Sequence, residues 1–348
     1  MKAAMRILFT MGMVLLVAAL LPAMGAGEAT QQDAGEIVVY SPFNDQFMQA
    51  LAAPFTAETG IEVLNVVIST GETVSRLRAE RQRPQADFWL SARPAILQGA
   101  FEEGLIAAYN PNGAANIRPE FRYDAAHITA VGTYPLVFFY NTQAIARANM
   151  QAPTGDWAQL LSPAYRDQVV MPHPATSGTA YSVITTIIQA HLQNNMSEDE
   201  AWQFVAGLNG AVAQFTRSGR APQTLVAQGE YPVGIGFYDA VWQLQQEGFP
   251  LEVVIPNPVF AEPYGAAVVA DAPNGANARR FFDYLLTPRA QAVLTQFGNY
   301  PVVAGVNPPV GGVSVPTEQV IDIDFLWSSA NRRAILDRFQ EVTQAEPQ

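Results

Sequence analysis

Residues 61–92 read IEVLNVVISTGETVSRLRAERQRPQADFWLSA, and this stretch decides the fold class. It contains a β-branched run at 61–69, a charged segment at 73–83 and an aromatic, apolar run at 86–92. The apolar runs predict strands, and the charged segment between them predicts a helix. A strand, a helix and a strand in succession are typical of parallel strands joined by a crossover helix.

The preceding residues repeat this alternation. The segment EIVVYS at 36–41 predicts a strand that ends at a Ser-Pro turn. Residues 43–59 predict a helix that closes on Gly60 and carries apolar residues at helical spacing, namely Phe47, Leu51 and Phe55. Three strand–helix units in a row predict an α/β fold with a parallel, helix-covered sheet.

Small polar residues or glycine stand at the carboxyl end of each of these strands. The candidates are Ser41 at the end of the first strand, Ser69, Thr70 and Gly71 at the end of the second, and Ser91 at the end of the third. Ligands of open parallel sheets bind at the carboxyl ends of the strands, so these residues are candidate ligand contacts. Ordinary turn and helix-cap chemistry is the alternative explanation.

Residues 128–145 form a continuous β-branched and aromatic run that is longer than an ordinary strand. Either two strands abut there, or one strand runs between two lobes. Residues 263–274 form a comparable run, and the two segments together predict a pair of hinge connections. Helices are expected at 277–286, then up to 297, and as one amphipathic helix at 325–344.

The segment HPATSGTAYSVITT at 173–186 places a Thr-Ser-Gly-Thr step before a helix without charge in its first turns. Free amides at Gly178 and Thr179, together with the positive end of the helix dipole, predict an anion site that includes Ser177. The alternative is a helix start satisfied by its own hydroxyls, from Ser177 or Thr176, and by water.

A second Ser-Gly step, Ser218 followed by Gly219, precedes another predicted helix within 215–230. Arg220 adds a planar fork of donors that suits phosphate or carboxylate oxygens. The alternative is an arginine in a solvated loop. This pairing of Arg220 with a helix start is a second candidate anion contact.

The run VGIGFYDAVW at 233–242 predicts a strand that ends at Tyr238 and Asp239. Both side chains can face a cleft. Asp239 either takes an ammonium or hydroxyl group from a ligand or caps the following helix. Glu262 and Tyr264, at the start of the second long run, are candidates of the same type.

Residues 1–26 have the layout of a secretory signal. Lys2 and Arg6 precede an apolar run at 7–21, and small residues follow at 23–26. An uncleaved membrane anchor is the alternative, but the run is short for a membrane span. We therefore expect an exported, periplasmic protein.

The composition excludes several classes of chemistry. The chain has no Cys, so disulfides, thiolate metal sites and a Cys nucleophile are excluded. The one Lys is Lys2, so the exported chain has no Walker lysine and forms no Schiff base. The formal charge changes from −12 to −14 when Lys2 and Arg6 leave, which predicts no nucleic-acid partner.

The inventory for catalysis is poor, and we expect no enzyme, no cofactor and no metal site. The three histidines, His127, His173 and His191, are far apart in sequence and match no metal-binding motif. His191 is most simply a structural residue of its helix. His173 lies close to the predicted anion step, where it can contact a ligand.

Several segments resemble, in order, the extracellular solute-binding proteins of ABC importers. After the signal they are EIVVYS, ISTGETVSRLRAERQRPQADFWLSA, PATSGTAY, SGRAPQTLVAQGEYPVGIGFYDA and GAAVVADAPNGANARRFFDYLLTPRAQ. The chain is most similar to the branch with ferric-ion-binding proteins and receptors for phosphonates and phosphorylated sugars. This resemblance covers nearly the entire exported chain.

The resemblance implies a type II periplasmic-binding-protein fold, with two hinge crossings and a ligand cleft between two lobes. The N-lobe would comprise 36–132 and 267–305, and the C-lobe 133–266 and 306–348. It also implies a monomer whose partners are a small anionic solute and a membrane permease. In the family, the helix start at 177–179 meets an anion.

Two departures separate this chain from its relatives. Iron-binding members carry consecutive tyrosines where this chain has Phe237 and Tyr238, a His at Asn44, and a Glu where it reads Ser91. Members that bind phosphorylated organic ligands often have a His-Asp pair at Tyr238 and Asp239, and an Asp at the position of His173.

The main hypothesis is therefore a receptor for a small phosphonate or phosphate ester. The helix start at 177–179, with Ser218 and Arg220, would hold the anionic group, and Asp239, with Tyr238 or Glu262, would read the organic end. The first alternative is a ferric-iron receptor with a synergistic anion. The second is an exported phosphoester hydrolase that uses His173 and Asp239.

Overall fold

The computed structural model describes residues 35–348 except 124, 126, 260 and 262. The expected signal at 1–26 and the candidate Glu262 therefore lie outside the described residues. Within the described ranges, no helix combines the length and the apolar composition that crossing a membrane requires.

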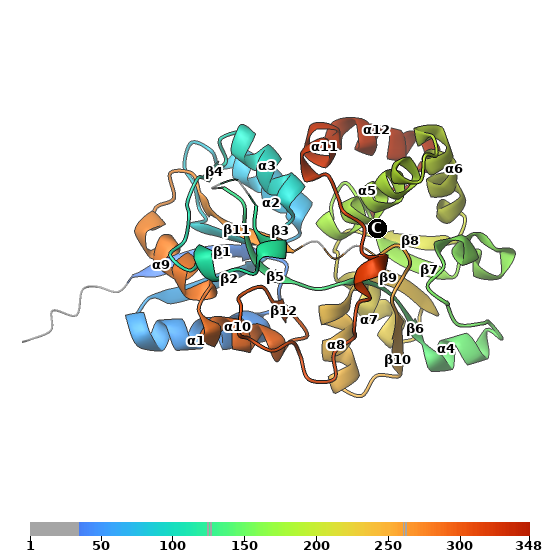
Figure 1. The fold of residues 1–348 in the computed structure, drawn as a ribbon, viewed down its shortest axis with the longest axis horizontal. Coiled ribbons are helices and arrows are strands. Elements are labelled where there is room, and N and C mark those ends of the chain that lie inside the picture. The colour runs from blue at the N-terminus through green and yellow to red at the C-terminus, as the bar shows by residue number, and fades with distance from the viewer. Residues whose placement is uncertain (1–34, 124, 126, 260, 262) are drawn as a thin grey trace, which may run out of the picture. The chain divides into compact units, whose positions relative to one another are not determined.

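The N-lobe is built on a seven-stranded sheet with the order β12-β5-β11-β3-β1-β2, and β4 pairs with β11 (Figure 1). Its strands are β1 (Glu36–Ser41), β2 (Glu62–Val67), β3 (Phe88–Ala92), β4 (Ile106–Ala107), β5 (Thr129–Thr133), β11 (Tyr264–Val269) and β12 (Tyr300–Pro301). Its helices are α1 (Asp45–Thr59), α2 (Thr70–Ala79), α3 (Pro94–Glu102), α9 (Gly275–Leu285) and α10 (Pro288–Thr295).

The C-lobe is built on a five-stranded sheet with the order β10-β6-β9-β7-β8. Its strands are β6 (Leu136–Asn141), β7 (Val169–Pro172), β8 (Val212–Thr216), β9 (Val233–Phe237) and β10 (Leu251–Val254). Its helices are α4 (Thr142–Arg147), α5 (Gly178–Gln193), α6 (Glu198–Asn209), α7 (Ala221–Ala227), α8 (Tyr238–Gln246), α11 (Phe325–Ala330) and α12 (Arg332–Thr343).

Short 3-10 helices lie in the connections of both lobes. They are η1 (Ala114–Asn116), η2 (Pro119–Phe121), η3 (Trp157–Leu161), η4 (Pro163–Tyr165) and η5 (Thr317–Gln319). The predicted parallel arrangement holds for β1, β2 and β3 and for β7, β8 and β9. Both sheets are mixed, because β11 runs antiparallel to β3 and β6 runs antiparallel to β9.

The run at 128–145 contains two strands that belong to different sheets. Strand β5 ends at Thr133 in the N-lobe sheet, and β6 begins at Leu136 in the C-lobe sheet. The chain returns to the N-lobe between β10 and β11, and it leaves again after β12. The ring of Tyr134, in the first crossing, stacks on Tyr264 at the second with centroids 4.9 Å apart. Aromatic packing thus joins the two crossings.

Two expected helices differ from those observed. Helix α2 begins at Thr70 rather than near residue 73, because Ser69 and Glu72 form a capping box at its start. The expected helix at 325–344 is two helices, α11 and α12, which meet at Asn331. The backbone amide of Asn331 (3.0 Å) and its side chain (2.9 Å) both donate to the Trp327 carbonyl at the end of α11.

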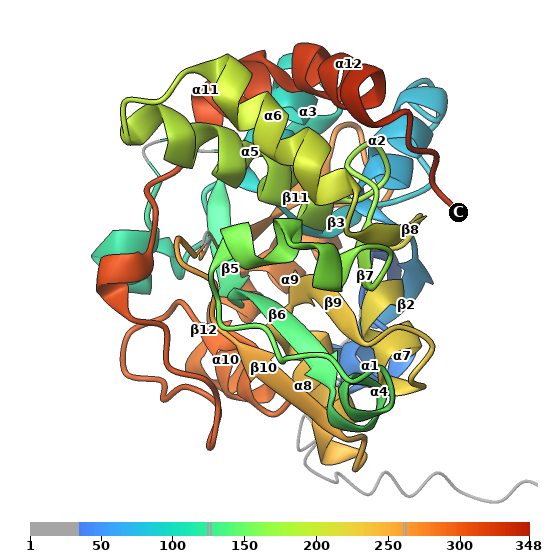
Figure 2. The ribbon, with the colours of Figure 1, turned by 90° about the vertical axis from the view of Figure 1, so that its right-hand side faces the viewer.

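Helix α11 contacts both lobes. Gln189 of α5 donates to Ser328 Oγ (2.8 Å) and accepts from the Asp324 amide (2.8 Å). On its other side α11 packs against α3 of the N-lobe, where a Cβ on Gly99 would lie 3.5 Å from Ser329 Oγ. Figure 2 shows α11 and α12 alongside α5 and α6.

The lobe boundaries stay a prediction at the level of single residues. The boundary expected between residues 132 and 133 falls at the end of β5, and the boundary expected between residues 305 and 306 follows β12. The change at 266–267 falls inside β11, which begins at Tyr264.

Candidate functional site

A cavity of about 30 Å³ lies where the carboxyl ends of strands from both lobes meet. Much of its lining comes from the N-caps and first turns of α2, α3, α5, α7 and α8. The lining residues are Pro42, Ser69, Thr70, Ser91, Arg93, Tyr134, Ser177, Gly178, Thr179, Gly219, Arg220, Gln223, Phe237 and Asp239. Helix N-termini carry partial positive charge, so their convergence favours a negatively charged occupant.

Helix α5 begins in this cavity without a side-chain cap. Its N-cap residue Ser177 makes no capping hydrogen bond. The Thr176 hydroxyl donates instead to the Arg217 carbonyl (2.8 Å). Among the described residues, no hydrogen bond engages the amides at 178–180. The backbone donors of this first turn are therefore available to a ligand.

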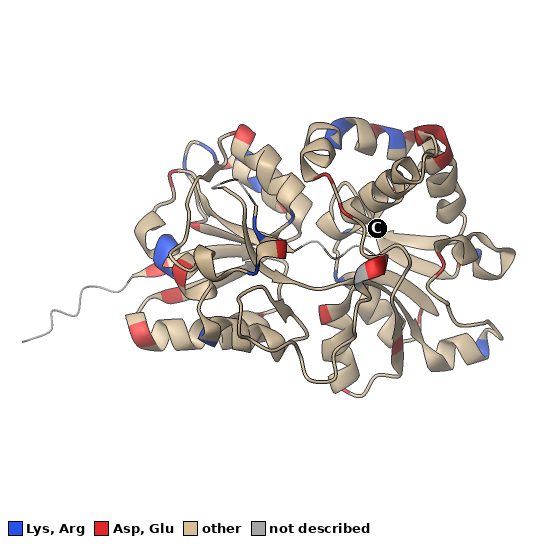
Figure 3. Cartoon of the chain, in the orientation of Figure 1, with Lys and Arg blue, Asp and Glu red and all other residues tan. Residues whose placement is uncertain are grey.

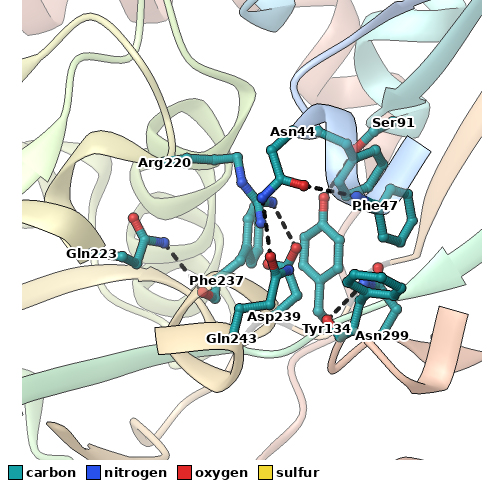
Figure 4. A network of polar contacts seen from close by, with 12 residues as sticks. Asn44, Phe47, Ser91, Tyr134, Arg220, Gln223, Phe237, Asp239, Gln243 and Asn299 are labelled. Carbon is teal, nitrogen blue, oxygen red and sulfur yellow. Dashed lines mark hydrogen bonds and ion pairs between the residues drawn. The ribbon is translucent and has the colours of Figure 1, made fainter. Parts of the chain in front are cut away.

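Arg220 and Asp239 form an ion pair at the edge of the cavity. Arg220 Nη1 lies 2.6 Å from Asp239 Oδ2, and the two side chains point toward each other (Figure 4). Burial lowers the pKa of Arg220, but the charge of Asp239 and its hydrogen bond raise that pKa by more, so the net shift is upward. The guanidinium is thus charged at every physiological pH.

Two buried acceptor oxygens in the lining have no partner among the described residues. They are Asp239 Oδ1 and Gln223 Oε1, and each residue is 1% exposed. The Gln223 amide donates through Nε2 to the Phe237 carbonyl (3.2 Å), which fixes its orientation. An unpaired buried acceptor is costly, so the cavity favours an occupant that carries hydrogen-bond donors.

Arg93, the N-cap residue of α3, brings a second guanidinium to the cavity. It is 4% exposed. Its guanidinium carbon lies 4.0 Å from the ring centroid of Phe237 and 5.0 Å from that of Tyr134. The lining therefore holds two guanidinium groups against the one carboxylate of Asp239.

Ser91, at the end of β3, holds a strained backbone conformation beside the hinge. Its φ of 74° lies in the left-handed region, which costs a non-glycine residue about 1–3 kcal/mol. The hydroxyls of Ser91 and Tyr134 lie 2.9 Å apart and share a hydrogen bond. Burial raises the pKa of Tyr134, so its hydroxyl remains protonated. This bond ties the end of β3 to the first crossing.

Direct contacts hold the two lobes together around the cavity. The Gly71 amide of α2 donates to the Thr176 carbonyl (3.0 Å). Asn44 donates to Gln243 (3.2 Å) on another side of the site (Figure 4). A water needs roughly 10–15 Å³, so the closed cavity has room for only a few such groups. A solute must therefore enter before the lobes close.

Some predicted site residues do not line the cavity. Ser41 is fully buried, and its hydroxyl donates to Asn65 Oδ1 (2.7 Å). Ser218 is exposed, and its hydroxyl accepts from the Arg220 amide (3.2 Å). Tyr238 lies in a separate apolar cluster of the C-lobe. Tyr264 is fully buried, and its hydroxyl donates to Asn299 Oδ1 (2.9 Å). Gly71 does not line the cavity either, and its amide instead makes the hydrogen bond to Thr176 between the lobes.

The remaining predicted residues do line the cavity, namely Thr70, Ser91, Ser177, Gly178, Thr179, Arg220 and Asp239. Ser69 and Gly219, which belong to the strand end and the Ser-Gly step singled out in the sequence, also line it. Sequence reasoning missed the other members of the lining, namely Pro42, Arg93, Tyr134, Gln223 and Phe237. A signal for Arg93 was present, because it directly follows β3, whose carboxyl end carries the candidate Ser91. No local signal marks Tyr134, which reaches the site through the crossing.

The histidines lie apart from one another. His127 stacks on Phe101 with centroids 4.0 Å apart, and His191 Nδ1 contacts the Ile187 carbonyl (2.7 Å). His173 does not line the cavity, although it was a candidate ligand contact. In the part of the chain that is described, no group of three or more His, Cys, Asp or Glu side chains could hold a metal ion. Arginine and acidic residues are spread over both lobes (Figure 3).

Known proteins are similar to this chain over most of its length. A Haemophilus influenzae protein without an assigned function is 28% identical over 289 residues, covering 82% of this chain and 81% of that protein. A Salmonella paratyphi A periplasmic protein, provisionally named for 2-aminoethylphosphonate binding, is 28% identical over 265 residues, covering 73% of each chain.

Solved structures share the fold. The periplasmic binding protein AfuA from Actinobacillus pleuropneumoniae, with fructose-6-phosphate bound, has a TM-score of 0.82 at 25% identity, over 90% of this chain and 99% of AfuA. Apo ferric ion-binding protein A of Pasteurella haemolytica has a TM-score of 0.71 at 20% identity, over 89% of this chain and 98% of that chain.

A family model described as bacterial extracellular solute-binding protein matches residues 84–326. This match spans both lobes and most of the cavity lining. The chain therefore belongs to the bacterial extracellular solute-binding proteins and is a solute-binding component of an ABC importer.

Proposed function

We propose that this receptor captures a small phosphonate or phosphate ester in the periplasm and delivers it to the membrane permease of its importer. The observation that carries the proposal is the uncapped start of α5 beside two guanidinium groups in one closed cavity. The free amides of 178–180 would hold anionic oxygens, and Arg93 and Arg220 would neutralise their charge.

The organic part of the solute would meet the unpaired acceptors. Asp239 Oδ1 and Gln223 Oε1 need donors, which an ammonium or hydroxyl group supplies. Binding of 2-aminoethylphosphonate and fructose-6-phosphate is named for relatives, and both compounds combine an anionic group with such donors. These likenesses support the proposed solute class.

Capture would work by hinge closure and population shift, without chemical change to the solute. The open form admits the solute, and the closed form adds the contact between Gly71 and Thr176. Because the solute contacts residues of both lobes, it favours the closed form. The predicted signal at 1–26 would export the chain, which would act as a monomer.

Calorimetry of the purified protein tests the proposal. The panel is 2-aminoethylphosphonate, fructose-6-phosphate, inorganic phosphate and ferric citrate. We expect saturable heat from 2-aminoethylphosphonate, from fructose-6-phosphate or from both. Heat from none of them, with a folded protein, contradicts the proposal, and binding of ferric citrate with visible colour supports the iron alternative instead.

Replacing Asp239 by Asn is expected to change the order of affinities. The variant loses the carboxylate that would meet an ammonium group, so 2-aminoethylphosphonate should bind roughly tenfold more weakly or worse. Methylphosphonate lacks that donor. It should bind to the variant more tightly than to the wild type, because the charge of Arg220 is no longer neutralised by Asp239. Calorimetry with both ligands measures the ratio, and an equal change for both contradicts the role given to Asp239.

Replacing Gly219 by Ala is expected to block the cavity. A Cβ there would lie 2.6 Å from Ser177 Oγ and 2.8 Å from Thr179 Oγ1, so both hydroxyls would have to turn. Overpacking costs about 1–3 kcal/mol, which is roughly 10–150-fold in affinity. Calorimetry with the best ligand of the panel measures this loss, and unchanged affinity would place the anion elsewhere.

A further inference from the structure

The imidazole of His173 is buried beside the start of α5 and is bonded at both ring nitrogens. Nδ1 lies 3.2 Å from the Ala175 amide nitrogen, and Nε2 lies 3.2 Å from the Ala345 carbonyl oxygen. The ring packs edge to face against Phe215 and Phe339, and the residue is 4% exposed. This burial in the C-lobe explains why His173 does not reach the cavity.

The two partners define the state of the ring. The Ala175 amide can only donate, so Nδ1 must accept and carries no hydrogen. The Ala345 carbonyl can only accept, so Nε2 must carry the hydrogen. The imidazole is therefore neutral, with its proton on Nε2. A second proton would place an N–H at Nδ1 against the N–H of Ala175, and that hydrogen bond would be lost.

His173 also closes the turn that leads into the cavity. Its carbonyl accepts from the amides of Thr176 (3.2 Å) and Ser177 (2.9 Å). Thr176 in turn accepts the hydrogen bond from Gly71 across the lobes. The free amides at 178–180 follow directly. One turn thus carries both the contact between the lobes and the donors of the anion site.

We propose that His173 is a positioning residue whose neutral ring holds residues 175–179 in the shape that binds an anion, and that protonation of the ring releases this turn. The inference rests on the proposed anion site. Ala175 is exposed and Thr176 is half-buried, so the turn lies at the surface of the C-lobe, where it can move.

The surroundings define the direction of the pH effect. Burial lowers the pKa of His173 below its ordinary value of 6.5, against smaller raising effects from the Ala345 carbonyl and the charge of Glu346. Strand β8 and helix α12 present aromatic rings, and the tail presents Glu346, the one charged group found to act on this imidazole among the described residues.

The sign follows from this lowered pKa. The released turn exposes the imidazole, whose pKa then returns toward 6.5. Between the two pKa values the released form binds more protons than the ordered form, so it gains population as the pH falls. The ordered turn is fully favoured above 6.5 and loses up to tenfold in relative population per pH unit, until the lower pKa is reached.

Two variants separate positioning from simple packing. In His173→Asn the side-chain oxygen can accept from the amide two residues on, as in an Asx-turn, and it does not titrate. In His173→Phe the aromatic packing is kept and both ring nitrogens are lost. The first variant should hold the turn at every pH, and the second should loosen it at every pH.

The first experiment needs no ligand. Long-range ¹H–¹⁵N spectra of the purified protein should show three imidazoles, of which the one absent from His173→Asn carries its proton on Nε2 at pH 8. Hydrogen-exchange protection of the amides near 175, corrected for intrinsic rates, should fall between pH 7 and pH 5 in the wild type but not in His173→Asn. A proton on Nδ1, or the same pH response in both proteins, overturns the inference.

The second experiment adds 2-aminoethylphosphonate as the probe. Its affinity for the wild type should fall relative to His173→Asn by up to tenfold per pH unit below 6.5, and the variant corrects for titration of the probe itself. If the ratio of the wild-type affinity to the His173→Asn affinity stays constant as the pH falls, the inference is overturned. If the probe binds neither protein at pH 8, the choice of this phosphonate as solute fails, and the tautomer and exchange results still decide the role of His173.

Discussion

Replacing Arg220 by Gln is expected to produce the largest loss of both stability and affinity. Asp239 is 1% exposed, and its ion pair with Arg220 is the one it makes among the described residues. Leaving a buried carboxylate without its partner costs about 3–5 kcal/mol of unfolding free energy. The cavity also loses a guanidinium, so the affinity for a phosphonate should fall roughly hundredfold or more. Urea unfolding and calorimetry measure the two effects.

A double variant and a distant control separate these effects. Arg220→Gln combined with Asp239→Asn removes the stranded charge, so it should recover most of the stability but none of the affinity. Arg333→Gln removes the same charge from a side chain that is 95% exposed on α12, and it should change neither property. If the single and double variants unfold at the same urea concentration, the pair does not act as a buried ion pair.

Replacing Gly71 by Ala is expected to prevent closure while leaving the lobes folded. A Cβ there would lie 2.6 Å from the Ala175 carbonyl oxygen and 2.8 Å from Thr176 Cα, and these backbone atoms cannot turn aside. Alanine suits a helix better than glycine by about 0.5–1 kcal/mol, so the unliganded protein should be as stable as before or slightly more stable. Affinity should fall roughly hundredfold, because the closed form is lost.

Small-angle scattering with and without 2-aminoethylphosphonate provides the readout for Gly71→Ala. The radius of gyration of the wild type should decrease when the solute is added, and that of the variant should not. Gly275→Ala is the matched control, because a Cβ at this first residue of α9 makes only an ordinary contact at 3.8 Å. Normal compaction and affinity in Gly71→Ala would show that closure does not bring α2 against the turn at 175–176.

Local sequence patterns predict the strands of the N-lobe well. The segment EIVVYS is β1 in its entirety, since a short β-branched run between turn residues has few alternatives. The pattern is less informative where a cap decides the boundary, as Ser69 does for α2. The break at Asn331 was also missed, because the apolar spacing continues through it and the bonds from Asn331 to Trp327 that mark the end of α11 cannot be read from that spacing.

The residues of the site also divide into those that local sequence patterns predict and those that depend on how the chain folds. Ser177, Gly178 and Thr179 were predicted because a helix start and its donors are local features of a sequence. Arg93 and Tyr134 were not predicted, because they reach the cavity through the packing of α3 and the path of the first crossing. The contact of Gly71 with the opposite lobe depends on how the two sheets are placed, which no short segment encodes.

The position of α11 has a consequence for the thermodynamics of capture. This helix is hydrogen-bonded to α5, whereas among the described residues its contact with α3 is apolar packing, so separation of the lobes would hydrate that seam. Closing it again removes apolar surface of α11 from water, and no residue of α11 lines the cavity. Capture should therefore carry a negative heat-capacity change larger than burial of so small a solute accounts for.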